Sequence, residues 1–367
     1  MKSVGIIIGD ITKRNGTERA VTSLSTILAE HIGISTHIIS IESSSGSSGF
    51  PLSPSVICHH LNLNLINNKQ SKIKNLWTVY HTLPAKIKKI CYENRLDAII
   101  GSDTSVNCLL TLIPSKIKRI ACEHFNYRAF QGVTELKRRL AYPYLDAIVL
   151  LTERDAANYT FIQKDRKFVI PNNLPFTPPP KTLSTFENKQ IVAVGRFSPQ
   201  KGFDLLIETM KYVHPFLPDW KLDIYGRGKE KERLISLIHQ DKLENTISIC
   251  DYEENILKVY QNASIYALSS RWEGFGLVLI EAMACGLPCI AFDIDSGPSE
   301  IITHGVDGYL ISPFNTKEFA ERIISLAQNK GMYETFSKNS MANVQRFSLS
   351  AIVEKWKSLL DKLGLLP

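Results

Sequence analysis

The sequence contains no apolar run close to the roughly 20 residues that a membrane-spanning helix requires. It has no Cys-x-x-Cys pair, and its seven cysteines are scattered and odd in number. These absences argue against a membrane-spanning protein and a disulfide-stapled one, and they favour free thiols in a reducing cytoplasm. No signal-peptide cleavage pattern is present, and the short N-terminal apolar run, closed by Gly9 and Asp10, predicts a buried first strand.

The composition is that of a globular protein. Of the 367 residues, 44% are hydrophobic and 22% are charged. This is enough apolar material for two cores, and the length is typical of about two domains. The balance excludes a disordered or collagen-like chain.

The positive charge is confined to the first half. The net charge is +7, but residues 1–170 hold 22 Lys and Arg against 13 Asp and Glu, whereas residues 171–367 hold 21 against 23. The two halves therefore carry +9 and −2. A basic half indicates an anionic partner: a phospholipid surface, a nucleic acid or a phosphorylated substrate.

In the first half, short apolar runs alternate with amphipathic stretches, which is typical of βα units and a parallel sheet. The predicted strands are Val4–Ile8, His37–Ile41, Ala98–Ile100, Ile120–Cys122, Ala147–Leu151 and Phe168–Ile170. The predicted helices are Glu18–His31, Ile73–Asn94 and Glu135–Tyr142. Ser43–Ser55, with seven serines, predicts a surface loop. Cys58-His59-His60 is interpreted as a strand end, because no second cluster at metal-ligand spacing accompanies it.

A linker and a second series of α and β elements follow. Pro175–Pro180 contains four prolines, which cannot continue a helix or a central strand. The predicted strands of the second series are Gln190–Val194, Lys221–Tyr225, Thr246–Cys250, Ile265–Leu268 and Pro288–Phe292. Its predicted helices are Phe203–Val213, Lys229–Gln240, Ile256–Gln261, Leu277–Cys285, Thr316–Gln328 and Met332–Val344, with a final amphipathic helix at Ser350–Leu365.

The expected fold class is therefore α/β, with two doubly wound, Rossmann-like domains that face each other across a cleft. We expect an N-terminal domain at 1–170, a linker at 171–189 and a C-terminal domain at 190–349. The last helix, within 350–367, is expected to pack back on the N-terminal domain.

Two segments carry residues suited to a phosphorylated ligand. In Val194–Gly202, Arg196 and Lys201 bring two cations to the carboxyl end of a predicted strand, although two solvated basic residues on a loop would look the same. In Glu273–Glu281, glycines precede a helix whose first backbone amides form an anion site. Glu281 lies on an apolar stretch, so it requires hydrogen-bond donors such as ribose hydroxyls; the simpler interpretation is an acidic helix N-terminus.

These two segments, together with Ser296–Ile302, resemble the GT4-type retaining glycosyltransferases, which have the GT-B fold. The resemblance is close over residues 190–330 and weaker in the first half. The form of Ser296–Ile302 resembles that of the enzymes that build bacterial exopolysaccharide, O-antigen and lipopolysaccharide. It implies that Arg196 and Lys201, beside Gly195, hold the departing diphosphate and that Glu273 contacts the donor hexose. It further implies that Phe275, Gly276 and Leu277 present backbone amides to the phosphates, and that Glu281 binds the ribose.

The resemblance reaches a few residues outside these segments. Asn15–Arg19 is similar to a glycine-rich loop of the family, of which only Gly16 matches. His124 stands where the family often places a histidine near the donor sugar, although a packed histidine is almost as good an interpretation. Tyr252 is implied to touch the base, but Asp251 stands where relatives commonly have glycine.

Two motifs point to other chemistry and are discounted. Asp293-Ile294-Asp295 spells a metal-binding Asp-x-Asp, but it leads into the Ser296–Ile302 loop, so we expect no metal and no cofactor beyond the sugar nucleotide. Gly226-Arg227-Gly228 has Lys231 in place of the third glycine of a dinucleotide fingerprint, so NAD is not expected.

Twelve of the 22 basic residues of the first half gather in three clusters: Lys69, Lys72, Lys74, Lys86, Lys88 and Lys89; Lys116, Lys118 and Arg119; and Lys137, Arg138 and Arg139. The amphipathic stretch Ile73–Asn94 is suited to an anionic bilayer surface, although a solvated helix face is the better explanation for any one lysine. No nucleic-acid-binding motif accompanies the charge, and we expect no nucleic-acid partner.

The resulting hypothesis is a cytoplasmic enzyme peripherally bound to the inner face of the cell membrane. It would move Gal, GalNAc, Glc or GlcNAc from a UDP-sugar to a lipid-linked oligosaccharide or lipopolysaccharide acceptor, with an α-glycosidic bond. The alternatives are a sugar-nucleotide epimerase of the same two-domain shape and a non-catalytic sugar-nucleotide-binding module.

Overall fold

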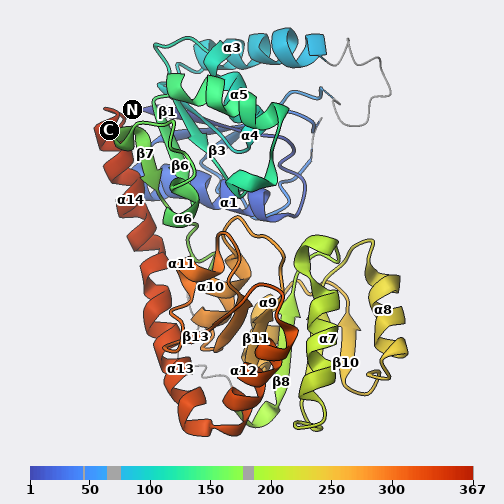
Figure 1. Cartoon of the computed structure of the whole chain (residues 1–367). Coiled ribbons are helices and arrows are strands. Elements are labelled where there is room, and N and C mark those ends of the chain that lie inside the picture. Colours follow the sequence, from blue (N-terminus) through green and yellow to red (C-terminus); the bar gives the residue numbers. More distant parts are fainter. Residues whose placement is uncertain (44–45, 64–75, 177–185, 367) are drawn as a thin grey trace. The chain divides into compact units, whose positions relative to one another are not determined.

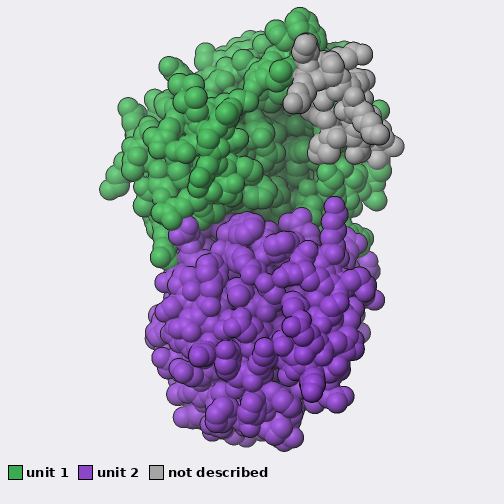
Figure 2. All heavy atoms as spheres, turned by 45° about the vertical axis from the view of Figure 1, so that its right-hand side comes forward, with its two compact units in different colours: residues 1–173, 349–367 green, residues 174–348 purple. Residues whose placement is uncertain are grey.

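The chain forms two compact units, each built around its own parallel sheet (Figure 1). The computed structural model describes residues 1–43, 46–63, 76–176 and 186–366. Unit 1 comprises Met1–Asn173 and Leu349–Pro367, and unit 2 comprises Leu174–Ser348; the atoms of each are distinguished in Figure 2.

The sheet of unit 1 has the strand order β3-β2-β1-β4-β5-β6-β7, and every neighbouring pair is parallel. Its strands are β1 (Ser3–Ile8), β2 (Ser35–Ser40), β3 (Val56–His60), β4 (Ala98–Gly101), β5 (Lys118–Cys122), β6 (Ala147–Leu150) and β7 (Lys167–Val169). Val4 of β1 pairs with Thr36 on one side and with Ala98 on the other. The order of the strands thus reverses between β1 and β4, where open α/β sheets bind ligands.

Helices cover both faces of this sheet. They are α1 (Gly16–Thr26), α3 (Leu83–Glu93), α4 (Thr104–Leu109), α5 (Val133–Ala141), α6 (Glu153–Ala156) and α14 (Leu349–Lys362). Shorter turns are η1 (Ile27–Ile32), η2 (Thr78–Thr82), η3 (Leu110–Leu112), η4 (Tyr127–Ala129), η5 (Tyr142–Tyr144) and η6 (Lys164–Arg166). One core joins α1 and α14 to the sheet and the other joins α3, α4 and η5 to it, so both faces are buried as a parallel sheet requires.

The sheet of unit 2 repeats this arrangement, with the order β10-β9-β8-β11-β12-β13 and parallel neighbours throughout. Its strands are β8 (Gln190–Val194), β9 (Lys221–Tyr225), β10 (Ile247–Cys250), β11 (Ile265–Leu268), β12 (Cys289–Phe292) and β13 (Gly308–Ile311). Its helices are α7 (Phe203–Val213), α8 (Lys231–Gln240), α9 (Ile256–Asn262), α10 (Leu277–Ala284), α11 (Pro298–Ile301), α12 (Thr316–Gln328) and α13 (Lys330–Asn343), with the turns η7 (Phe186–Asn188), η8 (Pro199–Lys201) and η9 (Val344–Phe347). The reversal of strand order falls between β8 and β11.

Elements with strong apolar periodicity occur where the sequence predicts them. The bounds of α7, β9, β11 and α12 agree with the prediction to the residue. The predicted helix Glu18–His31 is instead α1 followed by the π-helical turn η1, and β13 was missed. The strand β3 includes the Cys-His-His segment; four of its five residues are not buried, so it lacks an apolar run.

Some predictions fall outside the described residues. These concern Lys69, Lys72, Lys74, the first residues of Ile73–Asn94, part of the Ser43–Ser55 loop and most of the proline-rich linker. Within the part of the chain that the structure describes, no helix has both the length and the apolar character needed to cross a bilayer.

Helix α14 belongs to unit 1 although it follows unit 2 in the sequence. Its buried residues Ile352, Val353, Trp356, Leu359 and Leu360 recur at helical spacing and pack in the same core as β1 and α1. The C-terminal helix thus completes the hydrophobic core of the N-terminal sheet.

This packing predicts a stability effect confined to unit 1. Trp356 is 5% exposed, so Trp356→Ala should lower the free energy of unfolding by about 3–5 kcal/mol, because a large buried side chain leaves a cavity. Urea unfolding followed by circular dichroism measures this loss. The control Glu354→Ala, on the exposed face of the same helix, should stay within about 0.5 kcal/mol of wild type. Equal stability of Trp356→Ala and wild type would contradict the placement of α14.

Candidate active site

The reversal of strand order in unit 2 brings two of the predicted segments together. Residues 195–202 follow β8 and residues 269–276 follow β11, and these strands are hydrogen-bonded neighbours. Because the carboxyl ends of parallel strands lie at one edge of a sheet, both loops emerge at the same place.

A set of polar contacts ties the two loops to each other. The Arg271 guanidinium donates two hydrogen bonds of 2.8 Å to the Asp204 carboxylate and one of 2.9 Å to the Pro199 carbonyl. The Gln200 side-chain amide donates to the Trp272 carbonyl at 3.0 Å. A bidentate arginine–carboxylate pair restricts orientation as well as distance, so the loops are held in one arrangement.

Glycine is required where the loops meet. Gly202 has a φ of +62°, and a Cβ at this position would lie 2.1 Å from the Ser269 carbonyl oxygen. Any other residue would therefore push the β8 loop away from the β11 loop. A Cβ on Gly195 would lie 3.1 Å from the Lys201 side chain, which packs against that glycine.

The result is an ion pair between Lys201 and Glu273. The Lys201 ammonium nitrogen lies 2.6 Å from Glu273 Oε1, and the two side chains are only 15% and 8% exposed. The Ser270 hydroxyl donates to the same carboxylate oxygen at 2.6 Å, and the Ser296 hydroxyl donates to the Glu273 backbone carbonyl at 2.8 Å. Lys201 and Glu273, predicted separately, thus form one positioned group. Arg196, on the same loop as Lys201, is exposed to solvent.

The N-terminus of α10 lies at the end of the β11 loop. Gly276 caps this helix with a φ of +100° and without a side-chain hydrogen bond to its first amides. Phe275 is 3% exposed and packs edge-on against Phe347 at 5.4 Å, so its side chain belongs to the core. A ligand can therefore be bound by the backbone amides of Phe275, Gly276 and Leu277, since uncapped helix amides attract anions.

Glu281 lies one to two turns into α10 and is 1% exposed. Its Oε2 accepts a hydrogen bond of 3.0 Å from the Tyr260 hydroxyl on α9. The donor that a buried carboxylate needs is therefore supplied at least in part by the protein itself. The sequence predicted that Glu281 needs a hydrogen-bond donor. It did not identify Tyr260 as that donor, because Tyr260 lies on another helix.

Tyr252 lies beside the Gly226-Arg227-Gly228 turn. The Arg227 guanidinium carbon is 5.1 Å from the centre of the Tyr252 ring. Lys231, which replaces the third glycine of the dinucleotide fingerprint, forms an ion pair of 2.6 Å with Asp251, the departure from the family pattern. A Cβ on Gly226 would lie 1.9 Å from the Gly195 carbonyl oxygen, which shows how closely this turn approaches the β8 loop.

The Asp-x-Asp segment lies after β12. Asp293 is partly buried and Asp295 is exposed. Among the residues that the structure describes, no group of three or more His, Cys, Asp or Glu side chains is arranged to hold a metal ion.

Unit 1 places Gly16 at the start of α1, next to the N-cap residue Asn15, whose side chain makes no capping hydrogen bond. His124 follows the carboxyl end of β5. Both of its ring nitrogens are enclosed, and within the described ranges neither has a hydrogen-bond partner. This burial lowers the pKa of His124 to about 4, so the imidazole is neutral at physiological pH.

The preceding residue, Glu123, is the centre of a buried polar cluster. The Thr104 hydroxyl donates to its carboxylate at 2.9 Å, the Tyr142 hydroxyl donates to it as well, and Arg138 Nε lies 4.0 Å from Oε1. Burial raises the pKa of Glu123 to about 7 despite these partners. Arg138 was predicted to be part of a basic surface cluster; this is wrong, because its side chain is fully buried beside Glu123.

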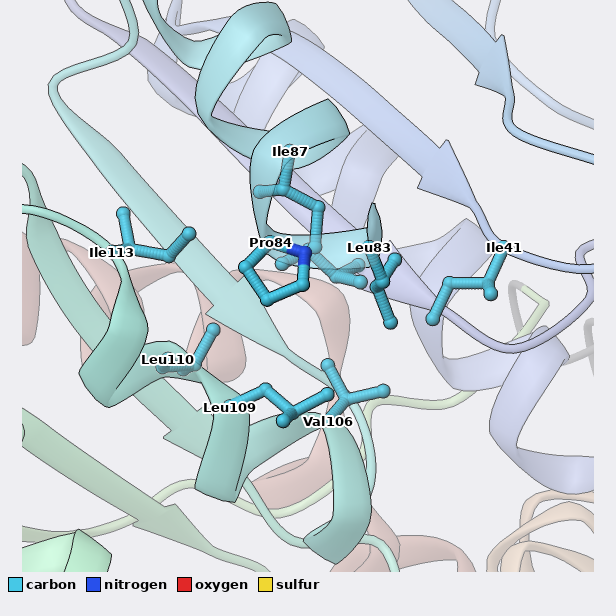
Figure 3. Close-up of a pocket in the computed structure, with 9 residues that line it drawn as sticks. Ile41, Leu83, Pro84, Ile87, Val106, Leu109, Leu110 and Ile113 are labelled. Carbon is cyan, nitrogen blue, oxygen red and sulfur yellow. The ribbon is translucent and has the colours of Figure 1, made fainter. Parts of the chain in front are cut away.

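Two cavities lie away from these residues. The first, in unit 1, is apolar (Figure 3) and has a volume of about 10 Å³, which is no more than one water molecule needs. It is lined by Ile7, Ile41, Leu83, Pro84, Ile87, Val106, Leu109, Leu110 and Ile113. The second, of about 210 Å³, lies in unit 2 between Gln190, Asp223 and Lys258, and neither Lys201 nor Glu273 lines it.

Known proteins resemble this chain over most of its length. The sequence profile of the family Glycosyl transferases group 1 matches residues 179–342. An uncharacterized glycosyltransferase of Haemophilus influenzae is 30% identical over 364 residues, covering 98% of this chain and 100% of that protein. The chain belongs to the group 1 glycosyltransferases.

Two further similarities bear on this glycosyltransferase. The amylovoran biosynthesis glycosyltransferase AmsD of Erwinia amylovora is 28% identical over 368 residues, covering 97% of this chain and 99% of AmsD. A variant of S. aureus TarM, in complex with fondaparinux, alpha-GlcNAc-glycerol and UDP, has a TM-score of 0.83 at 17% identity and covers 98% of this chain and 100% of that one. The family resemblance and the two-domain α/β fold of GT-B type are thereby confirmed.

The environment of His124 in this glycosyltransferase predicts a neutral ring. Ring-nitrogen NMR should show no protonation of His124 between pH 8 and about 5, since burial disfavours the charged form. Because the pKa of His124 is lower in the folded than in the unfolded state, protons bind preferentially to the unfolded chain as the pH falls. The contribution of His124 to the free energy of unfolding is therefore present above pH 6.5 and is lost as the pH falls toward about 4.

The variant His124→Gln serves as the control. It identifies the His124 signal by its disappearance, and the difference between its pH–stability curve and that of wild type isolates the contribution of this residue. A His124 signal that titrates near its ordinary pKa would contradict the enclosed environment.

Proposed function

We propose that this glycosyltransferase is a retaining hexosyltransferase. It moves Gal, GalNAc, Glc or GlcNAc from a UDP-sugar to a lipid-linked oligosaccharide or lipopolysaccharide acceptor and forms an α-glycosidic bond. The observation that carries the proposal is the enclosed Lys201–Glu273 pair at the strand reversal of unit 2, where Gly276 begins α10.

The cations act on the leaving group. As the bond from the anomeric carbon to the phosphate oxygen breaks, negative charge grows on the UDP diphosphate. Lys201, exposed Arg196 and the amides of residues 275–277 are suited to stabilise that charge, and positioned donors of this kind lower a barrier efficiently. Lys201 is already positioned by Glu273, so it need not reorganise during the reaction.

The remaining donor contacts follow from the same edge of the sheet. Glu273 contacts the hexose hydroxyls, Glu281 contacts the ribose with its carboxylate oriented by Tyr260, and Tyr252 contacts the base. Gly195 leaves room for the Lys201 side chain. In unit 1, Gly16 at the start of α1 and the neutral His124 are the residues that the family resemblance assigns to the donor.

The acceptor hydroxyl attacks from the face that the diphosphate leaves, so the anomeric configuration is retained. A phosphate oxygen of the donor takes the acceptor proton, and no dedicated protein base is required. The proposed donor and the α-linkage are supported by TarM, whose complex contains UDP and alpha-GlcNAc-glycerol. The polysaccharide acceptor is supported by AmsD, which is named for amylovoran biosynthesis.

A panel of UDP-sugars tests this proposal. At least one should raise the melting temperature of the protein, because a bound donor stabilises the folded state. The same donor should be slowly hydrolysed and should support transfer to a glycolipid acceptor. The variant Glu273→Gln should lose on the order of 10²–10³-fold in transfer, the size of effect seen when one positioned polar group is removed, while UDP still raises its melting temperature.

The matched control is Glu321→Gln, which removes a carboxylate from the exposed face of α12 in the same unit. Its transfer rate should equal that of wild type. Full activity of Glu273→Gln would refute the assigned role of Glu273. A protein that binds UDP-sugars but neither hydrolyses nor transfers them would be a binding module, and one that converts the UDP-sugar into its epimer would be an epimerase.

We further propose that transfer does not depend on a metal ion. The cations that neutralise the diphosphate are Lys201 and Arg196, and Asp295 is exposed on the loop after β12. Transfer measured in an excess of EDTA should match transfer measured with added Mg²⁺ or Mn²⁺. Loss of activity in EDTA that is restored by either ion would overturn this part of the proposal.

A further inference from the structure

Helix α5 in unit 1 has its apolar side chains outside and a charged side chain inside. Val133, Leu136 and Leu140 are 70%, 56% and 64% exposed, whereas Arg138 is 0% exposed. A helix on the surface of a soluble domain normally shows the opposite pattern.

The exposed apolar residues lie along one line of the helix. At about 100° per residue, Val133, Leu136 and Leu140 fall within one narrow stripe, and Arg138 points almost directly away from its centre. The stripe is therefore turned outward by the same rotation that turns Arg138 inward.

The rotation of α5 is fixed by the contacts of Arg138. Its Nη1 donates to the Tyr127 carbonyl at 3.1 Å, and its Nε lies 4.0 Å from the buried Glu123 carboxylate. Its guanidinium also stacks over the rings of Tyr127 and Tyr159, at 4.6 and 5.6 Å from their centres. Turning the stripe inward would remove a buried charge from these partners and leave Glu123 without its cation, which is strongly unfavourable.

The surroundings of the stripe are basic. Lys137 and Arg139 flank it on its two sides, and both are exposed. The one acidic residue of α5, Glu135, is held by Arg139 at 2.9 Å and by the Tyr127 hydroxyl at 2.9 Å. Glu135 compensates the charge of Arg139, so the excess positive charge at the edges of the stripe is that of Lys137.

A second exposed apolar group adjoins it. The Lys137 ammonium donates to the Tyr80 hydroxyl of η2 at 2.9 Å. Immediately before η2, Leu76 and Trp77 are 54% and 62% exposed. The α5 stripe, bordered by Lys137 and Arg139, is thus in contact at one edge with Tyr80, which follows Leu76 and Trp77 by about one helical turn.

We propose that this surface, centred on Val133, Leu136 and Leu140, docks unit 1 onto a bilayer that contains anionic lipids. The leucines and Trp77 would enter the interface, and Lys137 and Arg139 would lie at the lipid headgroups. An exposed apolar stripe edged by cations fits anionic lipid better than it fits a second copy of the same surface, because two such surfaces would bring like charges together.

Docking through α5 also has a consequence for the acceptor. The segment 123–132, which joins β5 to α5, begins at the strand end that carries His124. A bilayer held against α5 would keep this edge of unit 1 close to lipid-linked molecules. This consequence rests on the proposed function, whereas the docking itself does not.

Flotation of the full-length protein with phosphatidylcholine vesicles, with and without phosphatidylglycerol, tests the proposal. Wild type should bind the anionic vesicles, and high salt should weaken binding. The variant Leu136→Asp/Leu140→Asp should bind at least about tenfold more weakly, because each leucine contributes buried apolar area. Lys137→Ser should weaken binding to anionic vesicles roughly fivefold.

The matched control is Phe216→Asp, a 66% exposed aromatic residue of unit 2, which should bind as wild type does. A second pair of variants keeps the helix apolar. Brominated phosphatidylglycerol should quench the tryptophan fluorescence of Leu140→Trp more strongly than that of Phe216→Trp. Neither measurement uses a sugar donor, so an inactive transferase and a failed docking surface are distinguishable.

Several outcomes would overturn the proposal. One is equal vesicle binding by wild type and by Leu136→Asp/Leu140→Asp; another is no binding of wild type to anionic vesicles. If light scattering shows a wild-type dimer that the double variant dissociates while vesicle binding is unchanged, the occupant of the surface is a second copy of the chain.

Discussion

The close approach of two backbone segments in unit 2 is the constraint on which the candidate site depends. Gly202 lies against the Ser269 carbonyl, where no Cβ fits, and this contact allows the loops after β8 and β11 to touch. The Arg271–Asp204 pair then holds the loops together, and Lys201 reaches Glu273 within 2.6 Å. Without that approach, the cation and the carboxylate would be separate polar residues on two exposed loops.

A different constraint governs unit 1. There a buried charge cluster, Glu123 with Arg138, lies beneath α5, and its partners include Thr104, Tyr142 and the rings around Arg138. Burying charges is costly unless they are paired, so the cluster admits one orientation of the helix above it. The Glu123–Arg138 pair, which lies next to His124, therefore determines which side chains of α5 are exposed to solvent. Interior electrostatics and surface character are linked in this unit.

The fold was largely predictable because it rests on local periodicity. Alternating apolar runs and amphipathic stretches identify the parallel sheets, and α7, β9, β11 and α12 occur with the predicted bounds. The misses have physical causes. The missed strand β13 is a segment of four residues that begins with glycine, and the basic cluster at 137–139 divides because Arg138 points inward and Lys137 outward. In the site, Glu281 was expected to need a donor, but Tyr260 on another helix could not be identified as that donor from spacing.

The sequence by itself determined the two α/β halves, the family and the residues with the chemistry to hold a diphosphate, because motif spacing and apolar period are local properties. The tertiary structure decided which of those residues meet. Lys201 and Glu273 are joined by the reversal of strand order between β8 and β11. Lys231, which replaces a glycine of the dinucleotide fingerprint, and Asp251, which departs from the family pattern, are partners in space. The outward face of α5 depends on Arg138 finding Glu123 across the fold. Each of these is a pairing between distant segments, whose free energy exists only once the chain has folded.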